Sequence, residues 1–406
     1  MTKYALGWYP GSSAQIELFR PEQSQGGNYQ LKYTSPMRPT LRPPSAPYLL
    51  GPAELDPINE SLDALAAAQD SGRGDGDPDP AAAAEPAPPM SPPARAVTAE
   101  MVQRMAVLGD QLFVLLIPAE LRPDLRVAGA FLELGVDEML LGYPWELMHD
   151  GEEFLCLKHN LGRFVNARQG VGGGPARATA PGSGSDLSVL IISVAKPNAR
   201  GGGLPYRELP QVQAETMAVV AALQAQGIAA TLLAGQAATY DAVVDALKRH
   251  YDIIHFAGHG SFNQLDPGSS SIALWDKDMR ANAIRGFFGR SAPTFCFINA
   301  CESARVTGGP GAPAAPLGWK ERYDIFGIGR ALLETGSYLL GSRWPIGDTP
   351  AAAFAAEFYT QLLTEKPLGE VVRLARGACQ KASSGDDMAW ASYVFYGDPR
   401  VRFNRV

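Results

Sequence analysis

One histidine and one cysteine each stand immediately after an apolar run of the sequence. The run DIIHFA, residues 252–257, leads into a Gly-His-Gly triplet centred on His259, and TFCFINA, residues 294–300, leads into Cys301. A thiol becomes a nucleophile when an imidazole takes its proton, so the two side chains must meet in space. The flanking glycines, such as Gly260, allow close backbone approach and leave N–H groups for an oxyanion. The pair therefore indicates covalent thiol chemistry.

Simpler roles compete with this interpretation. After a strand, a lone histidine can cap or pack, and a lone cysteine can be buried and inert. We expect the latter for three cysteines: Cys156, Cys296 and Cys379. His255 lies inside its apolar run and is expected in the core. A metal site from His255, His259 and Cys301 would lack a close ligand pair and a fourth ligand, so we expect none.

Strands and helices alternate through the second half of the chain. Strands are expected at 187–195, 228–235, 252–257, 294–300 and 337–344, and a hairpin at 269–288. Helices are expected at about 209–226, after the capping residue Thr239, and near 325–335, 350–363 and 368–382. This alternation predicts an α/β fold with a mostly parallel sheet flanked by helices. The carboxyl ends of its parallel strands meet at one edge, which would bring His259 and Cys301 together.

The first half reads as a smaller α/β unit with short strands. Strands are expected around YALGWY, AQIELFR and NYQLKYT, a helix at 51–68, another from the N-cap Thr98, and strand-like runs around an HDGEE turn in 143–165. We predict five segments. These are an unassigned N-terminal unit (1–70), a disordered linker (71–97), an N-terminal half (98–169), a flexible linker (170–186) and a catalytic half (187–406).

Composition excludes several classes of function. The 406 residues carry a net charge of −7, which argues against an electrostatic grip on nucleic acid or anionic lipid. No apolar run approaches the roughly 18–20 residues that span a bilayer, and the N-terminus lacks an apolar leader. Four cysteines without a CxxC pair fit a reducing compartment, so we expect a cytoplasmic protein. No GxGxxG or Walker A loop follows the strand at 187–195, which counts against a nucleotide-binding domain.

Taken together, the motifs resemble the CHAT domain, a caspase- and separase-like cysteine peptidase module. HFAGHG (255–260) is similar to its histidine motif and INACES (298–303) to its cysteine motif; LLETGSYLLGSRWPIGD (332–348) and SYVFYGDPRV (392–401) match later motifs. The region 143–164 is similar to the N-terminal, pseudo-caspase-like half of the module. The resemblance covers about 95–406 and implies a caspase-like fold.

The resemblance also implies roles for individual residues. Cys301 would be the nucleophile and His259 the general base and acid, and the amides of Gly260 and Cys301 would form the oxyanion hole. No third carboxylate and no cofactor are required. Trp344 and Asp348 match the separase positions that hold a basic P1 side chain, although Asp348 could simply help to start a helix. The cysteine motif reads NACES rather than QACRG, so caspase-type Asp specificity is not expected.

The leading hypothesis is a cysteine endopeptidase that cleaves a specific protein partner within a bacterial defence or cell-death module. An activating protein or ligand is expected, and the loop 305–324 is expected to order on activation or to be cut at a basic residue. A tolerated surface insertion is the alternative for that loop. For the whole chain, the alternative is a catalytically silent scaffold of the same family.

Overall fold

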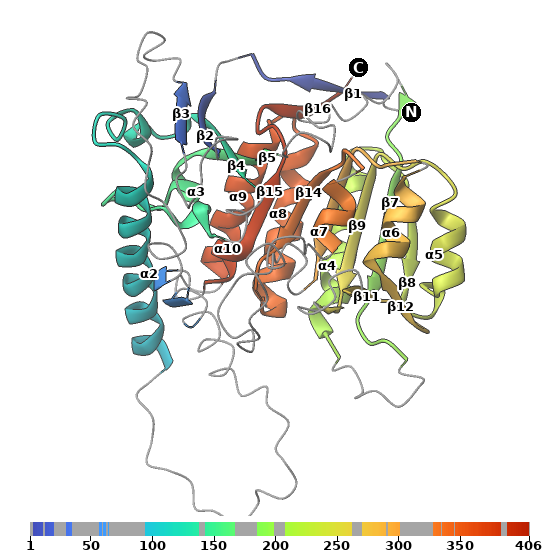
Figure 1. Ribbon diagram of the computed structural model, residues 1–406. Helices are drawn as coiled ribbons and strands as arrows, with labels where there is room; N and C mark the ends of the chain where they lie inside the picture. The colour runs from blue at the N-terminus through green and yellow to red at the C-terminus, as the bar shows by residue number, and fades with distance from the viewer. Residues whose placement is uncertain are drawn as a thin grey trace, which may run out of the picture.

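A ten-stranded sheet runs through the whole molecule (Figure 1). The computed structural model describes residues 3–10, 13–19, 30–34, 57–58, 60–61, 64, 94–137, 143–166, 185–198, 208–261, 270–289, 291–300, 328–333, 335–344, 346–382 and 388–405. The strand order is β3-β2-β4-β5-β15-β14-β13-β9-β7-β8. This confirms the predicted α/β class, with a large, mostly parallel sheet.

Two oppositely directed parallel sets make up this sheet. The first set comprises β2 (Ala14–Phe19), β4 (Phe131–Asp137), β5 (Asn160–Asn166) and β15 (Tyr393–Tyr396), with β3 (Gln30–Thr34) antiparallel at the edge. The second set comprises β14 (Tyr338–Ser342), β13 (Phe295–Asn299), β9 (Ile253–Gly258), β7 (Val189–Val194) and β8 (Ala230–Ala234). The sets meet where β14 pairs antiparallel with β15. The carboxyl ends of the second set therefore face one edge, and those of the first set face the other.

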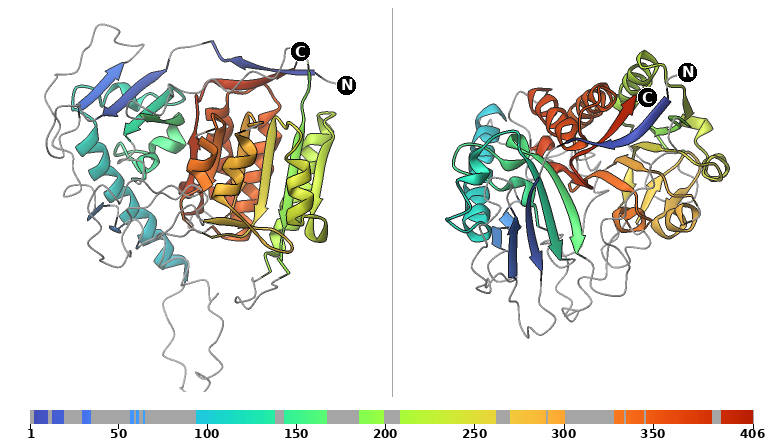
Figure 2. Two further views of the ribbon diagram at one scale, coloured as in Figure 1. Left: turned by 45° about the vertical axis from the view of Figure 1, so that its right-hand side comes forward. Right: turned by 90° about the horizontal axis from the view of Figure 1, so that it is seen from above.

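Helices cover both faces of the main sheet, with α9 (Leu368–Ala382) lying over β5 and β15 of the first set (Figure 2). On one face α4 (Pro210–Ala225), α8 (Asp348–Leu362) and α9 pack side by side. On the other lie α6 (Ala281–Phe288) and α7 (Ile328–Leu333). The short helix α5 (Tyr240–Ala246) begins after Thr239, whose hydroxyl accepts a hydrogen bond from the Ala242 N–H at 3.2 Å, which confirms the predicted cap. Two-sided cover explains why β7, β9 and β13 are buried throughout and consist mainly of apolar residues.

The chain termini form a separate small sheet. β1 (Lys3–Trp8) pairs antiparallel with β16 (Val401–Arg405), and two residues of β1 also pair with β6 (Ser185–Asp186). The N-terminal 70 residues are therefore divided, because β2 and β3 extend the main sheet while β1 joins the C-terminus. Residues 57, 58, 60, 61 and 64 are helical, as predicted. Most of both predicted linkers lies outside the described residues, so the five-segment division stays a prediction.

Three local expectations were wrong. The long helix α2 (Ala94–Leu116) begins four residues before Thr98, so that residue is not its cap. In 143–165 the run WEL forms a 3-10 turn (Trp145–Leu147) and LCLK a short helix, α3 (Leu155–Lys158), so only the last part is a strand. In 269–288 the hairpin of β11 (Ser271–Ala273) and β12 (Asp278–Arg280) ends early, because ANAIRGFF places Ile284 and Phe288 one helical turn apart on the buried side of α6.

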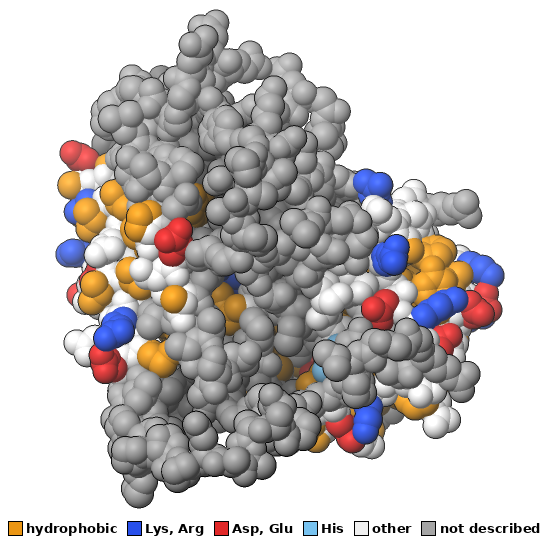
Figure 3. Space-filling model, turned by 60° about the horizontal axis from the view of Figure 1, so that its bottom comes forward, with side chains coloured by type: hydrophobic (Ala, Val, Ile, Leu, Met, Phe, Trp, Pro, Cys, Tyr) orange, Lys and Arg blue, Asp and Glu red, His pale blue; other side chains and the backbone are white. Residues whose placement is uncertain are grey.

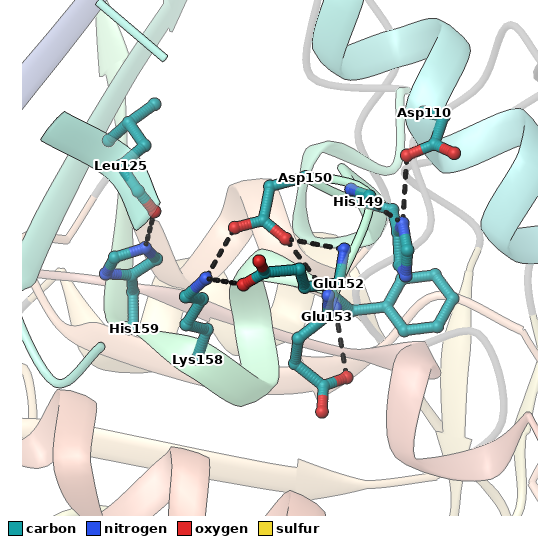
Figure 4. A network of polar contacts seen from close by, with 10 residues as sticks. Asp110, Leu125, His149, Asp150, Glu152, Glu153, Lys158 and His159 are labelled. Atoms are coloured by element: carbon teal, nitrogen blue, oxygen red, sulfur yellow. Dashed lines mark hydrogen bonds and ion pairs between the residues drawn. The ribbon is translucent and has the colours of Figure 1, made fainter. Parts of the chain in front are cut away.

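A polar network holds the HDGEE turn (Figure 4). Lys158 Nζ lies 2.6 Å from an Asp150 carboxylate oxygen, and the other oxygen accepts the N–H groups of Glu152 and Glu153. Burial alone would raise the pKa of Asp150, but these hydrogen bonds outweigh it and hold that pKa below its usual value. His149 Nδ1 lies 2.9 Å from an Asp110 carboxylate oxygen on α2. The turn thus ties α2 to α3.

The described part of the chain contains no helix whose length and hydropathy would suffice to cross a bilayer.

Candidate active site

Two adjacent parallel strands carry the candidate catalytic residues. β9 and β13 pair in register, with Phe297 opposite His255 and Asn299 opposite Ala257. The predicted dyad residues, His259 and Cys301, lie two residues after Ala257 and Asn299 respectively. Figure 3 looks onto this edge of the molecule, where described side chains of both charges are interspersed and a histidine is visible.

The backbone around His259 is clamped on both sides. Its carbonyl oxygen accepts a hydrogen bond of 2.9 Å from the N–H of Ala273, and Gly260 begins the short strand β10 (Gly260–Ser261), which pairs with β11. On the inner side, a Cβ on Gly258 would lie 2.8 Å from the carbonyl oxygen of Val194 on β7. Glycine is therefore required for β9 to pass this close to β7. His259 is half-buried at the end of this clamped segment.

Cys301 lies outside the described residues, but the chain leading to it is described. Asn299 and Ala300 are 7% and 5% exposed, so both are buried. The carbonyl oxygen of Ala300 accepts a hydrogen bond of 2.6 Å from the Ser342 hydroxyl at the end of β14. Adjacent Cα atoms are about 3.8 Å apart, so the position of Ala300 restricts where Cys301 can lie. The roles of Cys301 as nucleophile and oxyanion donor, and of Gly260 as the second donor, stay predictions.

Trp344 occupies a buried position just after β14. It is 6% exposed, and its N–H and carbonyl oxygen bond the Ser392 hydroxyl at 3.0 and 2.9 Å. The predicted pocket partner, Asp348, is the first residue of α8, after the N-cap Gly347. The side chain of Asp348 is not among those described, so the pocket stays a prediction.

The remaining cysteines are buried, as predicted: Cys156, Cys296 and Cys379. Burial raises the pKa of Cys156 to about 12 and also raises that of Cys296, which disfavours their thiolates at neutral pH. His255 is fully buried, as expected for a core residue. Among the described residues no group of three metal-ligating side chains comes together.

One group at this edge was missed by the sequence analysis. Glu215 of α4 is 3% exposed, and one of its carboxylate oxygens lies 2.7 Å from Asn299 Nδ2 and 3.1 Å from His255 Nε2. A signal was available, because Glu215 lies three residues after Val212 and four before Val219, on the apolar stripe of its helix. A carboxylate on such a stripe must find polar partners inside the protein.

Comparison with solved structures gives the fold context. The chain is similar to separase in the Saccharomyces cerevisiae separase–securin complex, at 10% identity and a TM-score of 0.50, covering 95% of this chain and 30% of separase. It therefore spans less than a third of the separase chain, and the likeness shows a shared caspase-like fold. A match to the Arg-specific cysteine proteinase gingipain R has 12% identity and a TM-score of 0.38, covering 77% of this chain and 70% of that one.

Sequence comparison is decisive for the family. No curated protein matches the chain. The CHAT domain profile matches residues 107–398, which is well over half of the sequence and includes both strand ends of the candidate site. The chain belongs to the CHAT domain family.

Proposed function

We propose that this protein is a cysteine endopeptidase in which Cys301 is the nucleophile and His259 the general base. Membership of the CHAT domain family and the separase-like fold support peptidase chemistry at the level of the family. One observation carries the assignment of residues: Asn299 and Ala257 are paired on adjacent parallel strands. The two candidate residues each lie two positions beyond that pair in the sequence.

Strand geometry makes this correspondence meaningful. Neighbouring strands lie about 4.8 Å apart, and residues two apart on a strand face the same side. The pairing of Asn299 with Ala257 therefore supports the proximity of Cys301 and His259, each two residues further along. The anchored carbonyl of Ala300 and the clamped backbone of His259 limit how far either can depart from this register.

The proposed reaction needs only these groups and water. His259 takes the thiol proton of Cys301, and the thiolate attacks the scissile carbonyl while the amides of Gly260 and Cys301 bind the oxyanion. The tetrahedral intermediate collapses as His259 gives its proton to the leaving amine, which leaves an acyl thioester. Water, deprotonated by His259, then hydrolyses the thioester and restores the thiol.

The test is covalent labelling. A peptidyl chloromethyl ketone is expected to label wild-type protein at Cys301, as found by peptide mass mapping, and labelling is expected to disappear in His259→Ala. Cys379→Ala is the matched control, because it removes a buried thiol elsewhere and should leave labelling intact. If Cys301 reacts no faster than an ordinary exposed thiol and His259→Ala changes nothing, the peptidase proposal fails and the scaffold alternative gains.

The finer proposal concerns substrate and setting. We propose that the substrate is a protein partner cut after a basic residue, with Asp348 and Trp344 shaping the pocket, and that an activating protein or ligand controls the enzyme in a bacterial defence or cell-death module. The family resemblance supports this proposal. Proteomic cleavage-site profiling with co-expressed genomic neighbours, comparing wild type with Cys301→Ala, tests it. If the cleavage sites found with wild type are also found with Cys301→Ala, the proposal is wrong.

A further inference from the structure

A buried polar cluster joins the elements behind the candidate dyad. It consists of Glu215 on α4, His255 on β9, Asn299 on β13 and Tyr393 on β15 (Figure 1). We propose that Glu215 is a positioning residue for the Cys301–His259 pair, because it contacts both of the strands that lead to them. The inference rests on the proposed function and deepens it.

The contacts converge on Asn299. Its Nδ2 donates to Glu215 Oε1 at 2.7 Å and lies 3.4 Å from the carbonyl oxygen of Ala351 on α8, and its Oδ1 accepts from the Tyr393 hydroxyl at 2.9 Å. The donor on one side and the acceptors on the other fix the orientation of the amide. Asn299 is thus held from three elements, two residues before Cys301.

The same Glu215 oxygen reaches the second strand. It lies 3.1 Å from His255 Nε2, four residues before His259, a distance at which a proton on Nε2 makes the contact attractive. Neither ring nitrogen of His255 forms a hydrogen bond within the described structure, and the ring packs edge-on against Phe297 and Tyr359. Among the described residues, the Glu215 carboxylate is the charged group that contacts this fully buried imidazole.

Burying these four polar side chains costs free energy, which their mutual contacts offset. The exposed fractions are 3% for Glu215, 0% for His255, 7% for Asn299 and 0% for Tyr393, and polar groups in such places lose their hydration. Burial, and then the nearby Glu215 carboxylate, raise the pKa of Tyr359 well above its usual value. An apolar residue at 215 would satisfy packing, but it could neither accept the hydrogen bond from Asn299 Nδ2 nor contact His255 Nε2.

The register explains how the cluster would act on chemistry. His255 pairs with Phe297, and Ala257 pairs with Asn299, so Glu215 contacts both strands within one step of the ladder. A misplacement of about 1 Å in a catalytic pair can cost about a hundredfold in rate. Removing Glu215 should therefore change the proton sharing between Cys301 and His259, and not only stability.

The readout is the reactivity of Cys301 without any substrate. The rate of alkylation by iodoacetamide is measured between about pH 5 and pH 10 by peptide mass mapping, which reports the thiol pKa in the folded protein. The variants are Glu215→Ala, Glu215→Gln and Tyr393→Phe. The control is Glu133→Gln, which alters a buried carboxylate in the other half of the sheet that bonds Gln15 Nε2 at 2.8 Å.

We expect Glu215→Ala to move the apparent pKa of Cys301 towards about 8.5, the value of a free thiol, and to lower the alkylation rate at neutral pH roughly tenfold. Glu215→Gln can keep an acceptor at Oε1 and should lie between wild type and Glu215→Ala. Tyr393→Phe should shift the profile in the same direction by less. Glu133→Gln should leave the profile unchanged.

The outcomes separate the two proposals. A wild-type Cys301 with an ordinary pKa that His259→Ala does not alter overturns the proposed function. A wild-type profile that depends on His259 but is identical in a folded Glu215→Ala protein overturns the positioning role alone. If Glu215→Ala does not fold, unchanged profiles in both Glu215→Gln and Tyr393→Phe overturn it instead.

Discussion

Ser342 and Ala300 lie on neighbouring strand ends, and the hydroxyl of Ser342 donates a hydrogen bond of 2.6 Å to the carbonyl oxygen of Ala300. Ser342 is fully buried, and Ala300 directly precedes Cys301. The end of β14 therefore fixes the backbone of the residue that precedes the candidate nucleophile in the sequence. The backbone just beyond is supported in turn, since Arg343 N–H donates to the Ser392 carbonyl oxygen at 2.8 Å.

Ser342→Ala is expected to lower the rate of Cys301 labelling by about tenfold while costing about 1 kcal/mol of unfolding free energy. The reason is that the Ala300 carbonyl oxygen loses the hydrogen-bond donor that holds it against the end of β14. Labelling kinetics and urea unfolding measure the two quantities. A labelling rate equal to that of wild type in a destabilised protein would show that the bond serves stability only.

Gly258→Ala should damage both folding and labelling. The new Cβ would lie 2.8 Å from the Val194 carbonyl oxygen and 3.1 Å from Phe256 Cζ, so β9 and β7 must separate. Overpacking of this kind costs about 1–3 kcal/mol. Gly377→Ala in α9 is the matched control, because its added Cβ has no neighbour within 4 Å and alanine favours the helix. Equal thermal stability of both variants would contradict the close approach.

A buried ion pair lies within the first strand set, between β5 and the turn Trp145–Leu147. Arg163 on β5 and Glu146 are both 1% exposed and in direct contact, and Arg163 also donates to the Tyr143 carbonyl oxygen at 2.9 Å. Arg163→Met leaves the Glu146 carboxylate buried alone and should cost about 3–5 kcal/mol. The double variant with Glu146→Leu should recover much of that loss. Chemical denaturation checks this, and additive losses would contradict it.

Stability should fall in acid partly through the Lys158–Asp150 pair. The folded-state pKa of Asp150 is lowered from 3.8, so its contribution is present above that value and is lost as pH falls through the lower folded-state pKa. The pKa of Lys158 is raised from 10.5: burial opposes this, but Asp150 outweighs it, so that contribution is lost only at more alkaline pH. Asp150→Asn should flatten the acid limb of a stability–pH curve. An unchanged limb would assign acid sensitivity elsewhere.

Asp348→Asn should separate the two roles considered for that residue. If its carboxylate binds a basic P1 side chain, kcat/KM for P1-Arg peptides should fall by about thirtyfold or more, as for a lost charge-assisted contact, while P1-Ala peptides are unaffected. If it only helps to start α8, stability should fall slightly and both substrates should be affected equally. Peptide assays paired with thermal unfolding discriminate between the two.

The loop 305–324, which lies outside the described residues, carries its own prediction. If the enzyme cuts itself at a basic residue there, wild type should acquire two fragments on incubation with its activator while Cys301→Ala stays intact. Intact-mass measurement is sufficient. Equal masses for both proteins would dispose of self-processing.

Periodicity predicted the second half of the fold well because its central strands, β7, β9, β13 and β14, are buried throughout. Continuous apolar runs such as 252–257 and 294–300 leave little choice of element, and they led directly to the strand ends at His259 and Cys301. The run FLCLK could not be resolved in this way, because a run of five residues, four of them apolar, fits a short helix as well as a strand. Pairing between distant segments, such as β2 with β4, leaves no local signature.

The candidate site was predictable only in part, for a related reason. Glycines around a histidine and a cysteine after a strand are local patterns. Glu215 acts across three elements, and its meaning appears only when α4 lies against β9 and β13. The buried hydroxyls of Ser342 and Ser392 are similar, since serine at a strand end ordinarily faces solvent.

The ladder between β9 and β13 also bears on how such proteins can diverge. Hydrogen bonds between the strands set the register, so the length of the crossover that contains β11, β12 and α6 does not enter into it. Insertions or deletions in that crossover can accumulate while the two strand ends remain neighbours. The number of residues separating histidine from cysteine is therefore free to drift among descendants of a common ancestor.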